Sequence, residues 1–129
     1  MKIHHLRSAT FIIESGEHYI LIDPMLGKKG SLPPFSVFRA KMQKNPTVEL
    51  PHNADELLDK VTHTLITHSQ TFGIKALQHG DHLDGAGEDF LSSRQLPVTT
   101  PSKDKAYIEK YGLNVEFGID DWQLSLIHI

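Results

Sequence analysis

The chain contains no cysteine, so disulfides are excluded and any metal site must use nitrogen and oxygen ligands. No apolar run approaches the length of a membrane span, and the N-terminus lacks the apolar core of a signal peptide. The net charge is −3, and no basic stripe interleaves with aromatic residues, which gives no electrostatic case for nucleic-acid binding. These absences favour a cytoplasmic protein whose partner is a small-molecule substrate, with neither a membrane nor a nucleic acid as partner.

At 129 residues, the chain is predicted to form a single domain, 1–129, or part of a larger one. Strand-like and helix-like patterns alternate after an opening hairpin, which predicts an α/β fold with a sheet covered by helices. The expected elements are strands at 9–14 and 18–23, a helix at 54–60, a strand at 63–67, a helix at 83–91, a strand at 96–100, a helix at 103–111, and strands at 114–117 and 123–129.

The second strand of the hairpin is almost continuously apolar up to Asp23, which predicts burial on both of its faces. The stretch 27–52 is rich in glycine and proline and is predicted to be a loop, either a wall of a pocket or a surface excursion. Asn53 is expected to cap the helix that follows.

His79-Gly80-Asp81-His82 is the most informative motif, because it places three metal-binding side chains within four residues. His68 lies upstream, where a predicted buried strand ends, so its imidazole can reach a cleft at the sheet edge. His79 and His82 share one face if they lie on one helical turn. Imidazole and carboxylate together suit Zn²⁺ or another divalent transition metal.

Residues 70–78 separate this motif from an upstream segment, 67–69, and the two together form one recognisable pattern when those nine residues are left out. Thr67-His68-Ser69 joined to His79-Gly80-Asp81-His82 resembles the Thr-His-x-His-x-Asp-His signature of the metallo-β-lactamase superfamily. The opening strands, 9–16 and 20–24, are similar to the N-terminus of predicted metal-dependent hydrolases related to L-ascorbate-6-phosphate lactonase. The resemblance covers most of the chain and implies the N-terminal half of an αββα sandwich with a dinuclear site, usually zinc, at one edge.

The resemblance also implies roles for individual residues. His68 and His79 would bind one metal, and Asp81 and His82 the other. Asp81 would thereby also be a catalytic residue. The site would hold one or two Zn²⁺ ions, with Mn²⁺ or Fe²⁺ as alternatives. Asp23, at the end of its strand, would support the ligands through hydrogen bonds.

The sequence departs from the family pattern in three places. Residues 70–78 separate His68 from His79, and a loop of this length costs about 1–2 kcal/mol to close relative to a short one. Arg7-Ser8 stands where members of this branch often carry Gly-His. The later ligands of the family, two histidines and a bridging aspartate, belong to a second half that does not follow Ile129 here.

Three functions fit this sequence. The first is a metal-dependent hydrolase of lactone, ester or phosphoester substrates that uses metal-activated water. The second is a truncated or degenerate half-domain that keeps the fold without turnover. The third is a half completed by another chain, since an unpaired edge strand at 123–129 favours homo-oligomer formation.

Overall fold

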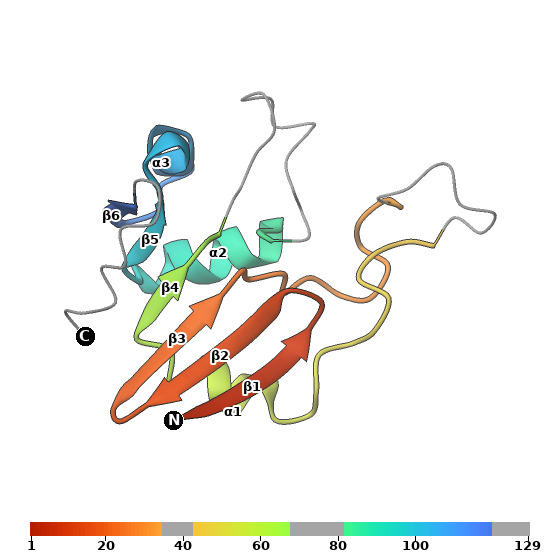
Figure 1. The fold of residues 1–129 in the computed structure, drawn as a ribbon. Coiled ribbons are helices and arrows are strands. Elements are labelled where there is room, and N and C mark those ends of the chain that lie inside the picture. The colour runs from red at the N-terminus through yellow and green to blue at the C-terminus, as the bar shows by residue number, and fades with distance from the viewer. Residues whose placement is uncertain (35–42, 68–81, 120–129) are drawn as a thin grey trace.

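A six-stranded mixed sheet forms the centre of the computed structural model, which describes residues 1–34, 43–67 and 82–119 (Figure 1). The strands lie side by side in chain order, from β1 to β6. β1, β2 and β3 pair antiparallel, whereas β3, β4, β5 and β6 pair in parallel. The carboxyl ends of four strands therefore meet at one edge of the sheet, which is where ligands bind in open α/β sheets.

The antiparallel part is a meander of β1 (Lys2–Arg7), β2 (Thr10–Ser15) and β3 (His18–Ile22). β2 and β3 form the predicted hairpin, and Gly16 in its turn has a φ of 61°, a conformation that glycine adopts without steric cost. β1 was not expected from the sequence. It is an edge strand in which half of the side chains are exposed, so it carries little of the apolar alternation that identifies strands.

The parallel part consists of β4 (His63–Leu65), β5 (Val98–Pro101) and β6 (Val115–Ile119). All three agree with the predicted strands to within a few residues. The last predicted strand, 123–129, and the oligomer contact assigned to it lie outside the described residues.

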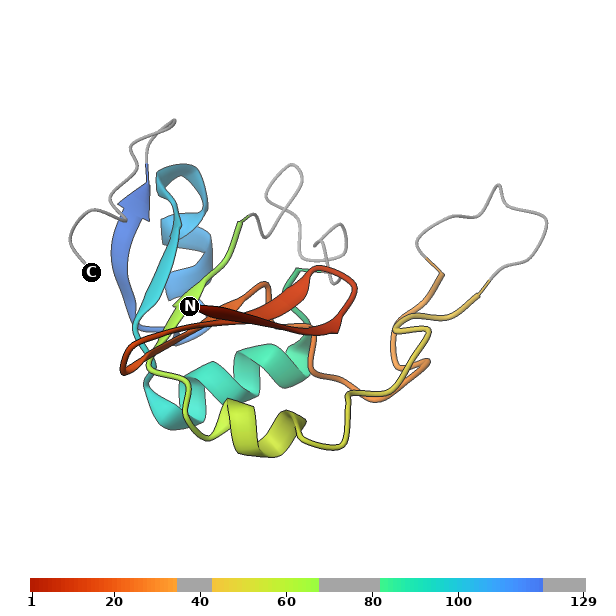
Figure 2. The same cartoon turned by 60° about the horizontal axis from the view of Figure 1, so that its bottom comes forward.

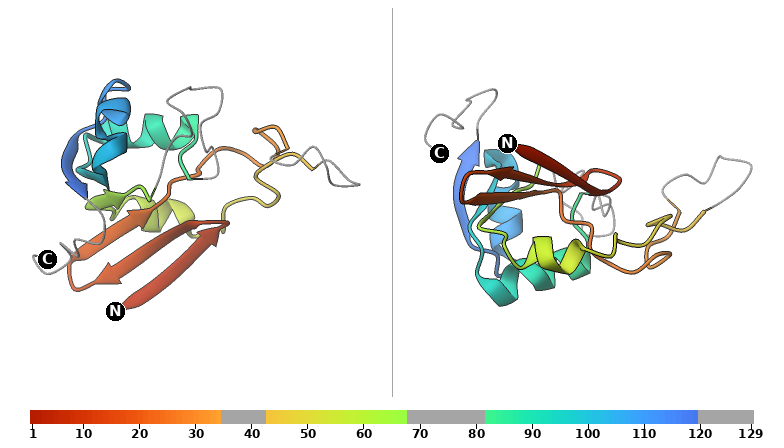
Figure 3. Two further views of the ribbon diagram at one scale, coloured as in Figure 1. Left: turned by 45° about the horizontal axis from the view of Figure 1, so that its top comes forward. Right: turned by 90° about the horizontal axis from the view of Figure 1, so that it is seen from below.

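Three helices cover one face of the sheet: α1 (Ala54–Leu58), α2 (Gly85–Arg94) and α3 (Ser102–Glu109). Figures 2 and 3 show α1 and α2 beneath the strands of the meander, with α3 beside β5 and β6. None of the described helices is long and apolar enough to cross a membrane. Strands and helices alternate after the meander, which confirms the predicted α/β class.

The hydrophobic core fills the space between the sheet and the helices. It draws alternate residues from the strands, such as Ile12 and Leu21, and apolar residues from every helix, such as Leu57, Leu91 and Ile108. The intervening strand residues, for example Ile20 and Ile22, are only half-buried. The prediction that the second hairpin strand is buried on both faces is therefore wrong: among the described residues, helices cover only one face.

The predicted loop 27–52 contains no helix or strand in its described parts, apart from a single bridge between Leu32 and Asn45. This connection extends away from the sheet (Figure 1). Asn53 occupies the position before α1 as predicted, but its side chain makes no capping hydrogen bond.

Candidate metal centre

Asp23 lies directly after β3, at the sheet edge where the carboxyl ends of the parallel strands meet. Its φ of 46° turns the chain sharply, and aspartate tolerates this left-handed conformation better than most residues. The Asp23 amide donates to the Leu65 carbonyl at 3.0 Å, and the Thr10 hydroxyl donates to the Asp23 carbonyl at 2.6 Å. Bonds to two other strands thus fix the backbone of this residue, which is 3% exposed.

The Asp23 carboxylate accepts two hydrogen bonds from Thr67, just beyond β4. The Thr67 amide donates to Oδ1 and the Thr67 hydroxyl donates to Oδ2, both at 2.7 Å. Two donors on one residue hold both oxygens, so the plane of the carboxylate is set by the end of the neighbouring strand.

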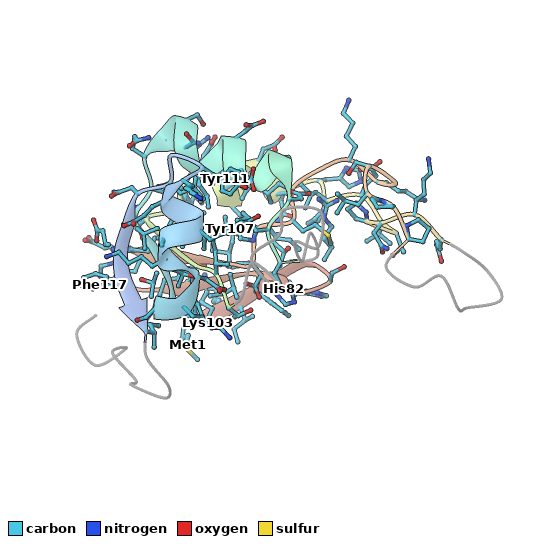
Figure 4. All side chains as sticks on the ribbon, turned by 90° about the horizontal axis from the view of Figure 1, so that it is seen from above. Met1, His82, Lys103, Tyr107, Tyr111 and Phe117 are labelled. Atoms are coloured by element: carbon cyan, nitrogen blue, oxygen red, sulfur yellow. The ribbon has the colours of Figure 1, made fainter. Side chains whose placement is uncertain are left out.

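His82 meets the same carboxylate from the start of the α2 region. Its Nδ1 lies 2.7 Å from Asp23 Oδ2 and 3.2 Å from Thr67 Oγ1. A carboxylate can only accept, so Nδ1 is the donor, and in a neutral ring the lone pair is then on Nε2. Nε2 is therefore the nitrogen that would bind a metal, in the carboxylate–histidine–metal arrangement common in metalloenzymes. The His82 side chain is 17% exposed, and Figure 4 shows it on the opposite side of α3 from Phe117.

Asp84 fixes the backbone immediately after His82. It caps α2 by accepting from the Gly87 amide at 2.8 Å. Its two carboxylate oxygens also accept from the amides of Leu26 and Gly27, at 3.0 and 2.7 Å. The segment that follows Asp23 and the helix that follows His82 are thereby joined by one buried side chain.

The structure brings two of the five predicted site residues together, namely Asp23 and His82. The other three, His68, His79 and Asp81, lie outside the described residues, so their assignments as metal ligands, and that of Asp81 as catalytic, stay predictions. Within the described ranges, no group of three or more histidine, aspartate or glutamate side chains is close enough to hold a metal ion. The donor chemistry of His82, oriented by a carboxylate, fits Zn²⁺ or a similar cation.

Sequence reasoning missed Thr67 and Asp84 as members of this cluster. Thr67 was part of the matched signature without a role of its own, because the partner of its hydroxyl lies 44 residues away in the chain. Asp84 had a detectable signal, since an aspartate that precedes a helix is a favoured cap. The predicted helix began two residues too early, at Leu83, and so concealed it.

The chain is similar to known proteins over part of their length. The chain is 33% identical over 91 residues to the UPF0173 protein YddR of Bacillus subtilis (strain 168), a match covering 70% of this chain and 32% of YddR. No protein-family model matches the chain.

Two solved structures share its architecture. A possible metal-dependent hydrolase from Veillonella parvula DSM 2008 matches with a TM-score of 0.73 and 30% identity over 91% of this chain. An isothiocyanate hydrolase from Delia radicum gut bacteria matches with a TM-score of 0.75 and 30% identity over 93% of it. The chain has the fold of part of these hydrolases. It spans about a third of YddR and about two fifths of the two solved chains, at 41% and 42%.

Proposed function

We propose that this chain carries part of the active site of a metal-dependent hydrolase of the metallo-β-lactamase type. His68, His79, Asp81 and His82 would hold one or two zinc ions, and Asp23 would support His82 from behind. The observation that supports the proposal most is the 2.7 Å contact between His82 Nδ1 and Asp23 Oδ2 at the carboxyl edge of the parallel strands.

The chain's own residues would do three things in such a site. Asp23 would hold the His82 ring in one tautomer and one orientation, because its carboxylate is itself fixed by both donors of Thr67. The turn after β3 would keep that carboxylate rigid, since the Asp23 backbone is bonded to Leu65 and Thr10. Asp84 would hold the backbone that carries His82 against residues 26 and 27.

A bound zinc ion would supply a water of lowered pKa and would polarise the oxygen of a substrate. The substrate class proposed from the residue types is a lactone, ester or phosphoester. The structural relative described as an isothiocyanate hydrolase adds isothiocyanates to the substrates worth testing.

Metal binding by the full 129-residue chain tests the proposal directly. Metal-free protein is titrated with Zn²⁺ against a chromophoric chelator, and the same titration is made on His82→Gln and on His52→Gln. His52 is an exposed histidine outside the cluster, so it serves as the matched control. We expect His82→Gln to weaken zinc binding at least about tenfold, the scale associated with perturbing a metal site, while His52→Gln leaves it unchanged.

Purified protein also gives a test by metal content. A catalytic metal site needs at least one bound ion. The proposal would therefore be rejected if the purified protein held less than about one tenth of an equivalent of zinc, manganese or iron and if His82→Gln bound zinc as weakly as the native chain. Metal bound with no hydrolysis of an ester, lactone, phosphodiester or isothiocyanate would favour the non-catalytic alternative.

A further inference from the structure

Arg7, at the end of β1, is a buried cation whose hydrogen bonds all end on backbone carbonyls. Its side chain is in the core with 2% exposure. Nε donates to the Met25 carbonyl at 2.8 Å, and Nη2 donates to the carbonyls of Met25 and Gly27. Nη1 donates to the Val48 carbonyl at 3.3 Å. A guanidinium taken out of water requires compensation of this kind together with a nearby negative charge.

Asp84 is the matching buried anion, with 4% exposure. Every hydrogen bond that the structure gives to its carboxylate comes from a backbone amide, those of Leu26, Gly27 and Gly87. Arg7 and Asp84 thus bind the same short segment, 25–27. Arg7 donates to its carbonyls, and Asp84 accepts from its amides.

One peptide group joins the two charges. The carbonyl of Met25 accepts from Arg7, and the amide of Leu26, which belongs to the same peptide unit, donates to Asp84 Oδ1 at 3.0 Å. The dipole of that peptide therefore points its negative end at the guanidinium and its positive end at the carboxylate. Burial lowers the pKa of Arg7, and the charges of Asp84 and Glu49 oppose that change.

Both residues of the candidate metal centre, Asp23 and His82, are close in sequence to the groups that Arg7 and Asp84 hold. Asp23 lies just before the segment, and its carbonyl accepts from the Met25 amide at 2.9 Å. His82 lies two residues before Asp84. The first turn of α2 packs against Pro24, the residue just before this segment, since a Cβ on Gly87 would stand 2.0 Å from the Pro24 carbonyl oxygen.

We propose that the buried charges of Arg7 and Asp84 stabilise each other through the Met25–Leu26 peptide that lies between them, and that this arrangement positions His82 against Asp23. Arg7 is then a positioning residue of the candidate centre, although it touches neither His82 nor the Asp23 carboxylate. If His82 binds a metal as proposed above, Arg7 affects metal binding through the orientation of the His82 ring.

The test combines two readouts on the metal-free, 129-residue chain. The first is a double-mutant cycle of Arg7→Met and Asp84→Asn, followed by urea unfolding. Arg7→Met keeps the apolar stem and removes the donors, and Asp84→Asn keeps an acceptor and removes the charge. A coupled buried pair predicts that the double variant differs from the product of the single effects by about tenfold in the unfolding equilibrium constant.

The exposed pair Arg94–Asp59 is the matched control for this cycle. Its Nη2 and Oδ1 atoms lie 2.5 Å apart, and both side chains face solvent with exposures of 40% and 69%. In the cycle of Arg94→Met and Asp59→Asn, the double variant should therefore change the unfolding equilibrium constant by the product of the two single changes, since exposed pairs couple weakly.

The second readout is the ring-nitrogen NMR signals of His82 at fixed pH. Arg7→Met is expected to move the His82 Nδ1 and Nε2 signals toward those of a mixed tautomer while the signals of exposed His63 stay in place. A merely structural role for Arg7 would lower stability and leave the His82 ring unchanged. If Arg7→Met does not fold, Arg7→Lys, which keeps the charge with fewer donors, is expected to give part of the same shift.

If the double variant of Arg7 and Asp84 changed the unfolding equilibrium constant by only the product of the single changes, the proposed interaction between the two charges would be overturned. Unchanged His82 signals in a folded Arg7 variant would overturn the positioning role. Because both measurements use metal-free protein, neither depends on whether the chain binds zinc or hydrolyses a substrate.

Discussion

Two buried aspartates of this fold, Asp23 and Asp84, have the same carboxylate and similar burial, yet their surroundings differ in kind. The hydrogen bonds to the Asp84 carboxylate come from three backbone amides, so this carboxylate only connects parts of the backbone. Those to Asp23 come from Thr67, and its Oδ2 also contacts the imidazole of His82. The difference separates a carboxylate that holds the scaffold from one that orients a potential metal ligand.

Removing the Asp84 carboxylate should cause the largest change. Asp84→Ala leaves three amides without their acceptor and the buried charge of Arg7 without its counterpart, so we expect a loss of about 3–5 kcal/mol in the free energy of unfolding. Urea denaturation measures it. The control is Asp89→Ala, an exposed residue on the same helix, which should stay within about 0.5 kcal/mol of the native chain. An equal loss in both variants would contradict the scaffold role.

Two glycines of α2 provide a matched test of how tightly the Asp84 side is packed. A Cβ on Gly87 would collide with the Pro24 carbonyl, whereas a Cβ on Gly85 would meet nothing within 4 Å. Gly87→Ala should therefore cost about 1–3 kcal/mol. Gly85→Ala should gain up to about 1 kcal/mol, because alanine reduces the entropy of the unfolded chain. Thermal unfolding of both variants checks the opposite signs.

Asp23→Asn should separate stability from function. Asparagine has the same shape and tolerates the left-handed backbone of position 23, so we expect a loss of only about 1–2 kcal/mol in stability. The amide cannot hold His82 and Thr67 as the carboxylate does, and the affinity for zinc should fall about 10–100-fold. Chelator competition measures the affinity. A large stability loss with unchanged zinc binding would reverse the roles assigned to the two aspartates.

The hydroxyl of Thr67 should have a smaller effect of the same type. Thr67→Val removes the donor to Asp23 Oδ2 and keeps the shape, with an expected cost of about 1 kcal/mol. Thr67→Ser keeps the hydroxyl and should restore the NMR signals of the His82 ring to their native positions. Native His82 signals in Thr67→Val would show that Thr67 does not help to hold the carboxylate.

Glu14, in β2, has a partly exposed carboxylate that can be compared with the two buried ones. Hydrogen bonds from His4 and Lys2 lower its pKa from the ordinary 4.5. The stability from this interaction is therefore present above about pH 4.5 and is lost as the pH falls through the lowered pKa. Urea midpoints of the native chain and Glu14→Gln, compared between about pH 3 and 6, should converge at the acidic end, with a difference far smaller than for either buried aspartate.

The elements that the sequence predicted well are those whose signal is local. The hairpin 10–22 has β-branched strands on either side of a glycine turn, and both strands formed as expected. β1 was missed because an edge strand needs no apolar alternation, and Lys2, Ile3 and His5 are exposed there. The half-buried face of β3 could not be foreseen, since continuous apolar sequence does not say whether a second layer covers it.

The candidate site was predictable only in part for the same reason. Asp23 and His82 were named from the sequence because one ends a strand and the other belongs to a dense motif. Arg7 and Thr67 act through partners that the sheet brings to them from 18 to 44 positions away. Burial of Arg7 is opposite to what its residue type predicts. The carbonyls of segment 25–27 and of Val48, with the charges of Asp84 and Glu49, compensate it only in the folded chain.

The order of pairing in the sheet has a consequence for the time at which the centre assembles. The meander β1–β3 joins strands separated by tight turns, whereas β3 must find β4 across a span such as Ile20 to His63. Contacts of low sequence separation form faster, so we expect the meander to fold first and the parallel strands to dock on it. Asp23 would then sit at a strand end without Thr67 or His82 during early folding. Pulse-labelled hydrogen exchange should accordingly protect the amide of Ile13 in β2 before that of Thr67.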